Sequence, residues 1–86
     1  MKEKDKKEKK LFHITFNVYK NLTKNPYEPA KWNCIASFQE ADVYAYTEKQ
    51  AYDHHAYEIA RSRFPKLIKK NDIIKIVKFD YEKAFN

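Results

Sequence analysis

The chain contains no glycine among its 86 residues, and this absence limits both what it can fold into and what it can bind. The phosphate-cradling loops of P-loop and dinucleotide-binding proteins each need several glycines. Tight two-residue hairpin turns favour Gly, Asn or Asp, because their central residues take positive φ angles. The sequence therefore excludes both nucleotide-binding motifs, and it disfavours a tight hairpin wherever Asn and Asp are also missing.

The length and the cysteine count narrow the class of protein further. A chain of 86 residues forms one domain at most and has no room for a separate cofactor domain. One cysteine excludes an internal disulfide and a multi-cysteine zinc module, and it fits a reducing compartment. No apolar run approaches the roughly 20 residues of a membrane span, and the charged N-terminus is unlike a secretory signal. We expect a soluble, cytoplasmic protein without a cofactor.

Two segments alternate between apolar and polar residues, which is the pattern of half-buried strands. Residues 11–20 alternate without interruption, and residues 32–46 alternate with a change of phase at Gln39-Glu40. Gln and Glu do not favour a primed turn, so a β-bulge explains the change better than a hairpin does. We therefore expect one long, bent strand over 32–46, and a loop over 21–31 with two of the three prolines.

A helix comes after the second strand. Thr47 with Gln50 three residues later is a capping box, and Pro65 disfavours a helical conformation at the residue before it. The helix should run from about Glu48 to Phe64, and residues 73–81 have the composition of a last strand. The fold class is thus α+β: a small β-β-α-β domain whose three-stranded, mostly antiparallel sheet has the first strand in its centre and one helix packed on one face.

The same alternation predicts which residues form the core. The predicted buried residues are Phe12, Ile14, Phe16, Val18, Cys34, Ala36, Phe38, Val43, Ala51, Ile59 and Phe64. In the order of its elements and its Thr-Glu-Lys-Gln-Ala helix entry, the chain resembles small ribosomal and phage-type β-β-α-β proteins. This resemblance implies a topology for residues 11–81 and nothing about activity.

The net charge of +6 is concentrated in two segments. Residues 1–10 carry +3 with no apolar residue after Met1, so they should form a disordered Lys-rich tail that precedes a single domain over 11–86. Residues 61–70 carry +5 without an acid, which leaves −2 for the rest of the chain. Such a local cluster predicts a site for RNA or DNA. Its residues are Arg61, Arg63, Lys66, Lys69 and Lys70.

The sheet face that the helix does not cover, which we call the open face, is expected to carry a row of aromatic side chains. The residues predicted to act there in stacking or protein docking are Tyr19, Ile35, Tyr44 and Tyr46. Exposed aromatics on a sheet are typical of RNA-binding modules, and equally of protein interfaces. The pattern leaves two hypotheses. One is a nucleic-acid-binding or nucleoprotein-associated protein, such as one encoded by a phage, virus or mobile element; the other is an inhibitor, adaptor or subunit that docks on a protein partner or on a second copy.

The sequence offers little for catalysis or metal binding. His54 and His55 are adjacent on the helix and point about 100° apart, which suits no common metal site. Cys34 and His55 could in principle pair as nucleophile and base, but a buried cysteine is usually a small core residue. We therefore expect neither an enzyme nor a metal site.

Overall fold

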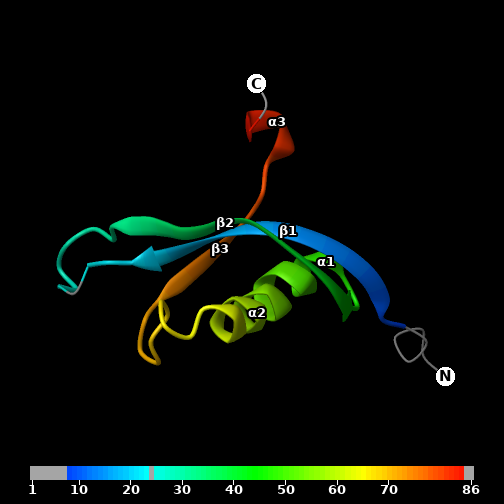
Figure 1. Ribbon diagram of the computed structural model, residues 1–86, viewed down its shortest axis with the longest axis horizontal. Helices are drawn as coiled ribbons and strands as arrows, with labels where there is room; N and C mark the ends of the chain where they lie inside the picture. Colours follow the sequence, from blue (N-terminus) through cyan, green and yellow to red (C-terminus); the bar gives the residue numbers. More distant parts are fainter. Residues whose placement is uncertain (1–7, 24, 85–86) are drawn as a thin grey trace.

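The structure, a computed structural model, describes residues 8–23 and 25–84. Its centre is an antiparallel sheet of order β2-β1-β3, with the helical segment packed below it in Figure 1. The strands are β1 (Lys10–Asn21), β2 (Trp32–Ala45) and β3 (Ile74–Lys78). The predicted α+β class, the central position of the first strand and the single covering helix are all confirmed.

The helix begins at Glu48, as predicted, and continues for 16 residues. The Gln50 N–H donates to the Thr47 hydroxyl at 3.0 Å, and Phe64 leaves the helical conformation ahead of Pro65. A π-helical turn lies within it, and this wider turn brings Ala51 and Ala56 to the same buried face. The three consecutive parts are α1 (Glu48–Gln50), η2 (Ala51–His55) and α2 (Ala56–Arg63).

The core lies between the helix and one face of the sheet. Ile14, Phe16 and Val18 of β1 are fully buried there, and the helix meets them with alanines, so the two layers can approach closely. The other buried apolar residues are Val43, Ala45, Ala51, Ala56, Ala60, Ile68 and Ile74. Of the predicted core residues, Phe12, Ala36, Ile59 and Phe64 are partly buried and pack against this cluster.

β2 is a single long strand, as expected, but its register against β1 changes twice. Phe16 pairs with Gln39 and Val18 with Ala36, which leaves one extra residue in β2 around Phe38. Tyr19 then pairs with Cys34, so a second extra residue lies at Ile35. The sequence predicted the first irregularity one or two residues late and missed the second.

The two irregularities correct two core predictions: the second reverses the faces of residues 32–35, and the first displaces Phe38. Cys34 is exposed on the open face, because it pairs with Tyr19 rather than with a core residue of β1. Phe38 is 45% exposed and takes a φ of 52°, a left-handed conformation that is costly for a bulky residue. Ile35 moves the other way and packs against the core.

The C-terminal segment also differs from its prediction. β3 ends at Lys78, and a short turn of helix, α3 (Tyr81–Ala84), rises from the open face in Figure 1. Asp80 precedes α3, and its carboxylate accepts the N–H groups of Glu82 and Lys83. The predicted disordered tail over 1–10 concerns mainly residues 1–7, which lie outside the described residues; Lys10 already belongs to β1.

Two helix tyrosines complete backbone hydrogen bonds that the strands leave open. The Thr15 N–H donates to the Tyr52 hydroxyl at 3.2 Å, just beyond the part of β1 that pairs with β3. The Ile76 N–H donates to the Tyr57 hydroxyl at 3.3 Å on β3, which is an edge strand. Unpaired backbone groups at a strand edge can pair with another chain. These two contacts satisfy such groups and also hold the helix against the sheet.

Candidate functional site

The predicted cationic cluster divides into two groups with different surroundings. Arg61 donates to the Asp72 carbonyl at 2.9 Å and so ties the helix to the loop before β3. Arg63 donates to the Glu40 carbonyl at 2.7 Å and to the Gln39 side chain at 3.2 Å. Both guanidinium groups thus hold the end of α2 against other elements, a role that arises from tertiary contacts and not from the local sequence.

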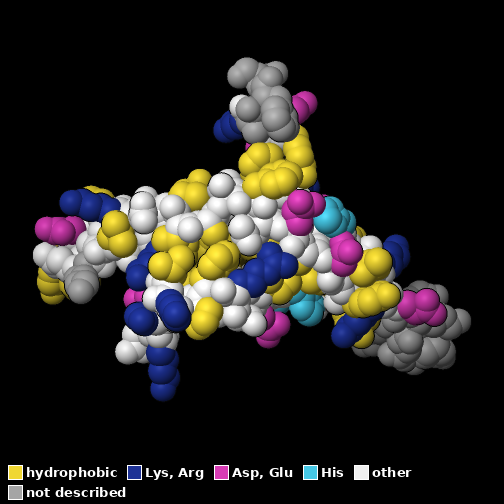
Figure 2. Space-filling model, in the orientation of Figure 1, with side chains coloured by type: hydrophobic (Ala, Val, Ile, Leu, Met, Phe, Trp, Pro, Cys, Tyr) yellow, Lys and Arg dark blue, Asp and Glu magenta, His cyan; other side chains and the backbone are white. Residues whose placement is uncertain are grey.

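The three lysines of the cluster lie in the loop between α2 and β3. Lys66, Lys69 and Lys70 are exposed, and within the described residues their ammonium groups form no ion pair. Figure 2 shows Lys and Arg side chains gathered around this loop. Three neighbouring cations without carboxylate partners repel one another, so the loop is suited to an anionic ligand.

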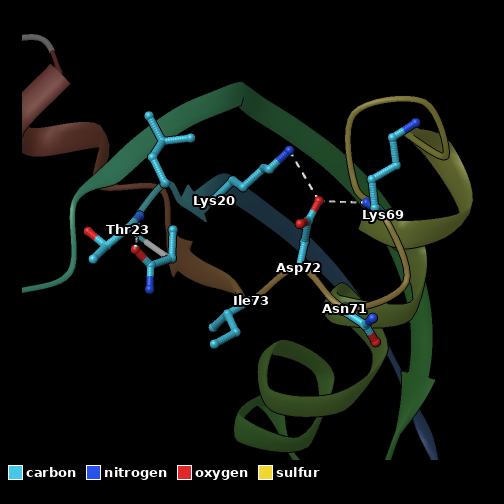
Figure 3. Close-up of a pocket in the computed structure, with 8 residues that line it drawn as sticks. Lys20, Thr23, Lys69, Asn71, Asp72 and Ile73 are labelled. Atoms are coloured by element: carbon cyan, nitrogen blue, oxygen red, sulfur yellow. Dashed lines mark hydrogen bonds and ion pairs between the residues drawn. The ribbon is translucent and has the colours of Figure 1, made fainter. Parts of the chain in front are cut away.

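Asp72 shapes this loop without neutralising its lysine side chains. The Lys69 backbone N–H donates to the Asp72 carboxylate at 2.7 Å, and the Lys20 ammonium lies 3.1 Å from it (Figure 3). The Lys69 N–H, and after it the Lys20 hydrogen bond, holds the pKa of Asp72 below its usual value. Between the loop and the end of β1 lies a cavity of about 450 Å³ lined by Lys20, Asn21, Leu22, Thr23, Lys69, Asn71, Asp72 and Ile73.

The predicted aromatic row does not form one continuous surface. Tyr19 lies on the open face near the loop, whereas Tyr44 pairs with Leu11, eight residues away along β1. At about 3.3 Å per residue this separation is roughly 26 Å. Tyr46 comes after the end of β2 beside the helix start, and Ile35, predicted on the open face, packs against the core instead. Only Tyr19 therefore remains near the basic loop.

Tyr19 has neighbours that the sequence did not point to. The Lys75 ammonium lies 4.6 Å from the centre of the Trp32 ring and 5.8 Å from that of Tyr19. Trp32 reaches this position because of the second register change in β2, and it is 37% exposed. A lysine held over two aromatic rings offers a positive charge and π faces at the same place.

Next to Tyr19 the open face is hollowed into a groove of about 460 Å³. Its lining residues come from β1, from β3 and from the segment leading into α3: Asn17, Tyr19, Val77, Phe79, Asp80 and Lys83. Phe79 continues into a cluster of edge-to-face aromatic contacts with Phe38 and Tyr81. Hydrophobic side chains gather at the foot of α3 in Figure 2.

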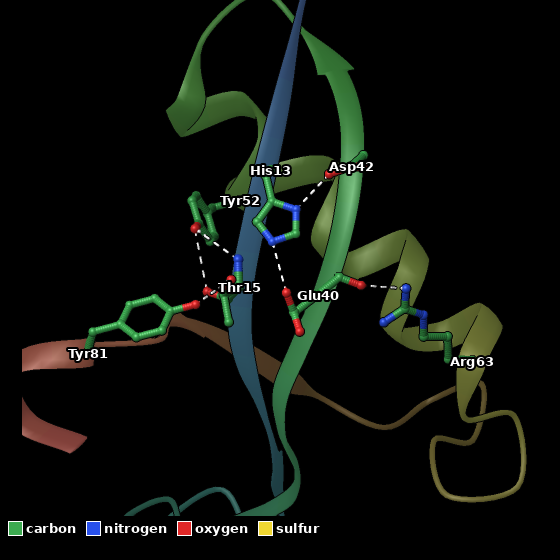
Figure 4. A network of polar contacts seen from close by, with 7 residues as sticks. All are labelled: His13, Thr15, Glu40, Asp42, Tyr52, Arg63 and Tyr81. Carbon is green, nitrogen blue, oxygen red and sulfur yellow. Dashed lines mark hydrogen bonds and ion pairs between the residues drawn. The ribbon is translucent and has the colours of Figure 1, made fainter. Parts of the chain in front are cut away.

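The centre of the open face is acidic and already satisfied by protein contacts. The His13 ring lies between two carboxylates, with Nδ1 2.6 Å from Asp42 and Nε2 2.9 Å from Glu40 (Figure 4). The Asp42 hydrogen bond, and then the Glu40 hydrogen bond, raise the pKa of His13 above 6.5. Beside them Thr15 is only 5% exposed, and its hydroxyl contacts the Tyr81 hydroxyl at 3.2 Å.

The basic loop and Tyr19 thus share one end of the sheet but approach it from opposite faces. The loop leads directly into β3, where Ile74 is buried on the helix side and Lys75 lies over Tyr19 on the open side. Lys70 and Lys75 are five residues apart, a reach of at most about 18 Å. We call this region the basic aromatic end, comprising Tyr19, Trp32, Lys66, Lys69, Lys70 and Lys75.

Comparison of the chain with protein families, with curated proteins and with solved structures found no match. In the part of the chain that the structure describes, no group of His, Cys, Asp and Glu side chains is arranged to hold a metal ion. None of the described helices is long and apolar enough to cross a membrane.

Proposed function

We propose that this protein binds single-stranded nucleic acid, RNA or DNA, through its basic aromatic end. The observation that carries the proposal is the position of Lys75, over the Trp32 and Tyr19 rings and directly after a loop whose three lysines form no ion pair among the described residues. Proteins that bind single strands combine cations for the backbone with aromatic rings on which bases stack. The proposed activity is binding without catalysis, in a cytoplasmic setting that suits the exposed Cys34 thiol.

The division of the cationic cluster refines which residues should contact phosphates. Arg61 and Arg63 bind neutral oxygens of the protein itself, so they contribute to the local potential more than to direct contacts. Lys66, Lys69 and Lys70 are free to reach phosphates, and Lys75 connects them to the rings. Such contacts read no sequence, so affinity should be modest and should fall with added salt.

Binding at the basic aromatic end can be measured without adding a label to the protein. Trp32 is the single tryptophan, so its fluorescence reports directly on the candidate surface. Titration with short oligothymidine and oligouridine should quench this emission at low salt. The logarithm of the affinity should fall linearly with that of the salt concentration, with a slope of about −2 to −3.5 for three to five phosphate contacts.

A pair of charge-matched variants tests the location of the site. The combined change Lys66→Glu, Lys69→Glu and Lys70→Glu should abolish binding. The control, Lys9→Glu with Lys10→Glu and Lys49→Glu, alters the net charge equally at the other end of the sheet and should weaken binding far less. Equal losses would show that only net charge matters, and an absence of binding at low salt would overturn the proposal.

A second candidate function, docking on a protein partner or on a second copy, is favoured by the apolar surface of the open face. Phe38 and Val77 are substantially exposed there, and the two arginines of the cluster are engaged within the chain. Exposed apolar patches on small proteins often mark interfaces. Sedimentation equilibrium distinguishes this candidate: a dimer that Val77→Glu dissociates, together with no oligonucleotide binding, would favour it.

A further inference from the structure

The groove beside Tyr19 combines an apolar floor with an aromatic ring at each end. Val77 faces Asn17 across the β1–β3 pair and supplies an apolar floor. Tyr19 lies two residues further along β1, and Phe79 lies two residues further along β3, so the two rings stand at opposite ends of the groove. A volume of about 460 Å³ admits a nucleobase with room for its sugar.

Asn17 and Asp80, two polar residues that line this groove, each use one side-chain oxygen in hydrogen bonds within the protein. The other polar atom of each side chain is available to a ligand. The Phe38 N–H donates to Asn17 Oδ1 at 2.9 Å; since a backbone N–H can only donate, the Asn17 NH₂ group must be the other atom. Asp80 Oδ1 accepts two backbone N–H groups at the start of α3. Among the described residues nothing bonds to Asn17 Nδ2 or Asp80 Oδ2, so the groove offers one donor group and one carboxylate acceptor.

We propose that this groove holds a single base of the bound strand and prefers guanine. The inference rests on the proposed function and adds a specificity to it. The free oxygen Oδ2 of Asp80 has two lone pairs and only accepts hydrogen bonds, so it can accept from two neighbouring donors. Guanine alone among the bases presents two adjacent N–H donors on its pairing edge, at N1 and N2. Its neighbouring O6 accepts, which suits the Asn17 NH₂ group or the Lys83 ammonium. Thymine and uracil offer one N–H between two carbonyls, so they satisfy Asp80 less well.

The test compares strands that differ at one position. An oligothymidine with one central guanosine should bind about tenfold more tightly than oligothymidine alone, the ratio expected for a good paired contact to a base edge. Inosine lacks the 2-amino group of guanosine and should fall between the two. Trp32 fluorescence and the anisotropy of a labelled strand both report these affinities.

The Asp80→Asn variant tests the proposed contact with guanine while keeping the hydrogen bonds that cap α3. It keeps Oδ1 as the acceptor that caps α3 and replaces the acceptor Oδ2 by an amide NH₂ group. The guanosine preference should disappear while oligothymidine affinity is kept or rises slightly with the lost negative charge. Asp80→Ser retains a capping hydroxyl and gives a second variant with the same expectation. Asp53→Asn removes an equal charge from the helix and should leave the preference unchanged.

The outcomes distinguish this inference from the proposed function. If guanosine and thymidine strands bind wild-type protein equally while Trp32 is still quenched, the guanine subsite is wrong and the nucleic-acid interface stands. A guanosine preference that survives both Asp80 variants would also overturn the inference, because the carboxylate would not be reading the base. If no strand binds at low salt, the proposed function fails together with the subsite.

Discussion

The two faces of the sheet carry different kinds of side chain, and they contribute differently to stability and to binding. On the helix side, β1 presents Ile14, Phe16 and Val18, all fully buried against alanines of the helix. On the open side the same strand presents His13, which is exposed, and Tyr19, which is half-buried. Apolar burial is the main stabilising contribution in a small domain. The helix side therefore determines the stability, and the open side can carry binding groups at little cost.

The largest expected effect contrasts two residues of one strand. Phe16→Ala should lower the free energy of unfolding by about 3–5 kcal/mol, because it opens a cavity in the centre of the core. Tyr19→Ala, three residues away on the open face, should cost about 1 kcal/mol or less and should weaken strand binding instead. Urea denaturation monitored by circular dichroism measures both values. Similar losses for the two variants would show that the faces contribute equally to stability.

The alternation of apolar and polar residues predicted the helix-side face of β1 correctly, because β1 contains no extra residue. Its four alternate apolar residues all face the helix, and the capping residues placed the helix start at Glu48. The prediction failed over residues 32–35 and at Phe38, where apolar residues also alternate but the strand contains two extra residues. Each extra residue moves the neighbouring stretch of the strand to the opposite face, and nothing local in Asn33 to Ser37 signals the second reversal.

The candidate site shows the same limit. The three loop lysines could be picked out because a run of cations without acids is visible in the sequence. The roles of Arg61 and Arg63 depend on carbonyl groups distant along the chain, which composition cannot reveal. Trp32 and Lys75 come together only through the register of β2 and β3 against β1. Tertiary pairing, rather than residue type, decides which aromatics are available for binding.

The next effect concerns the bulge that separates the regular and irregular parts of β2. Phe38 takes a left-handed conformation that glycine would adopt freely, in a chain without glycine. Phe38→Gly and Phe38→Ala remove the same ring contacts with Phe79 and Tyr81, so their difference isolates the backbone. The glycine variant should be more stable than the alanine variant by about 1 kcal/mol. Denaturation midpoints measured side by side give this difference.

The opposite order for the Phe38 variants would mean that the bulge relaxes once the ring is removed. A comparison on the regular part of the strand controls for the intrinsic cost of glycine. Tyr44→Gly should be less stable than Tyr44→Ala, because Tyr44 lies in extended strand where glycine is unfavourable. The contrast between the two sites would locate the strain at Phe38 alone.

The smallest expected effect concerns His13, in the acidic centre of the open face. Both ring nitrogens lie within hydrogen-bonding distance of carboxylate oxygens, an arrangement in which both must donate, so the imidazolium is the favoured form. The pKa of His13 in the folded protein should therefore exceed 6.5, and Asp42→Asn should lower it, since Asp42 is the largest contributor. Because the folded pKa is the raised one, the associated stability is fully present below pH 6.5 and is lost as the pH rises through the folded value.

An NMR titration of the His13 Hε1 signal, with urea-unfolded protein as reference, measures the shift. A folded pKa at or below the unfolded one would mean that the two carboxylates do not hold the ring in solution, and that this centre, unlike the core face, has no fixed structure.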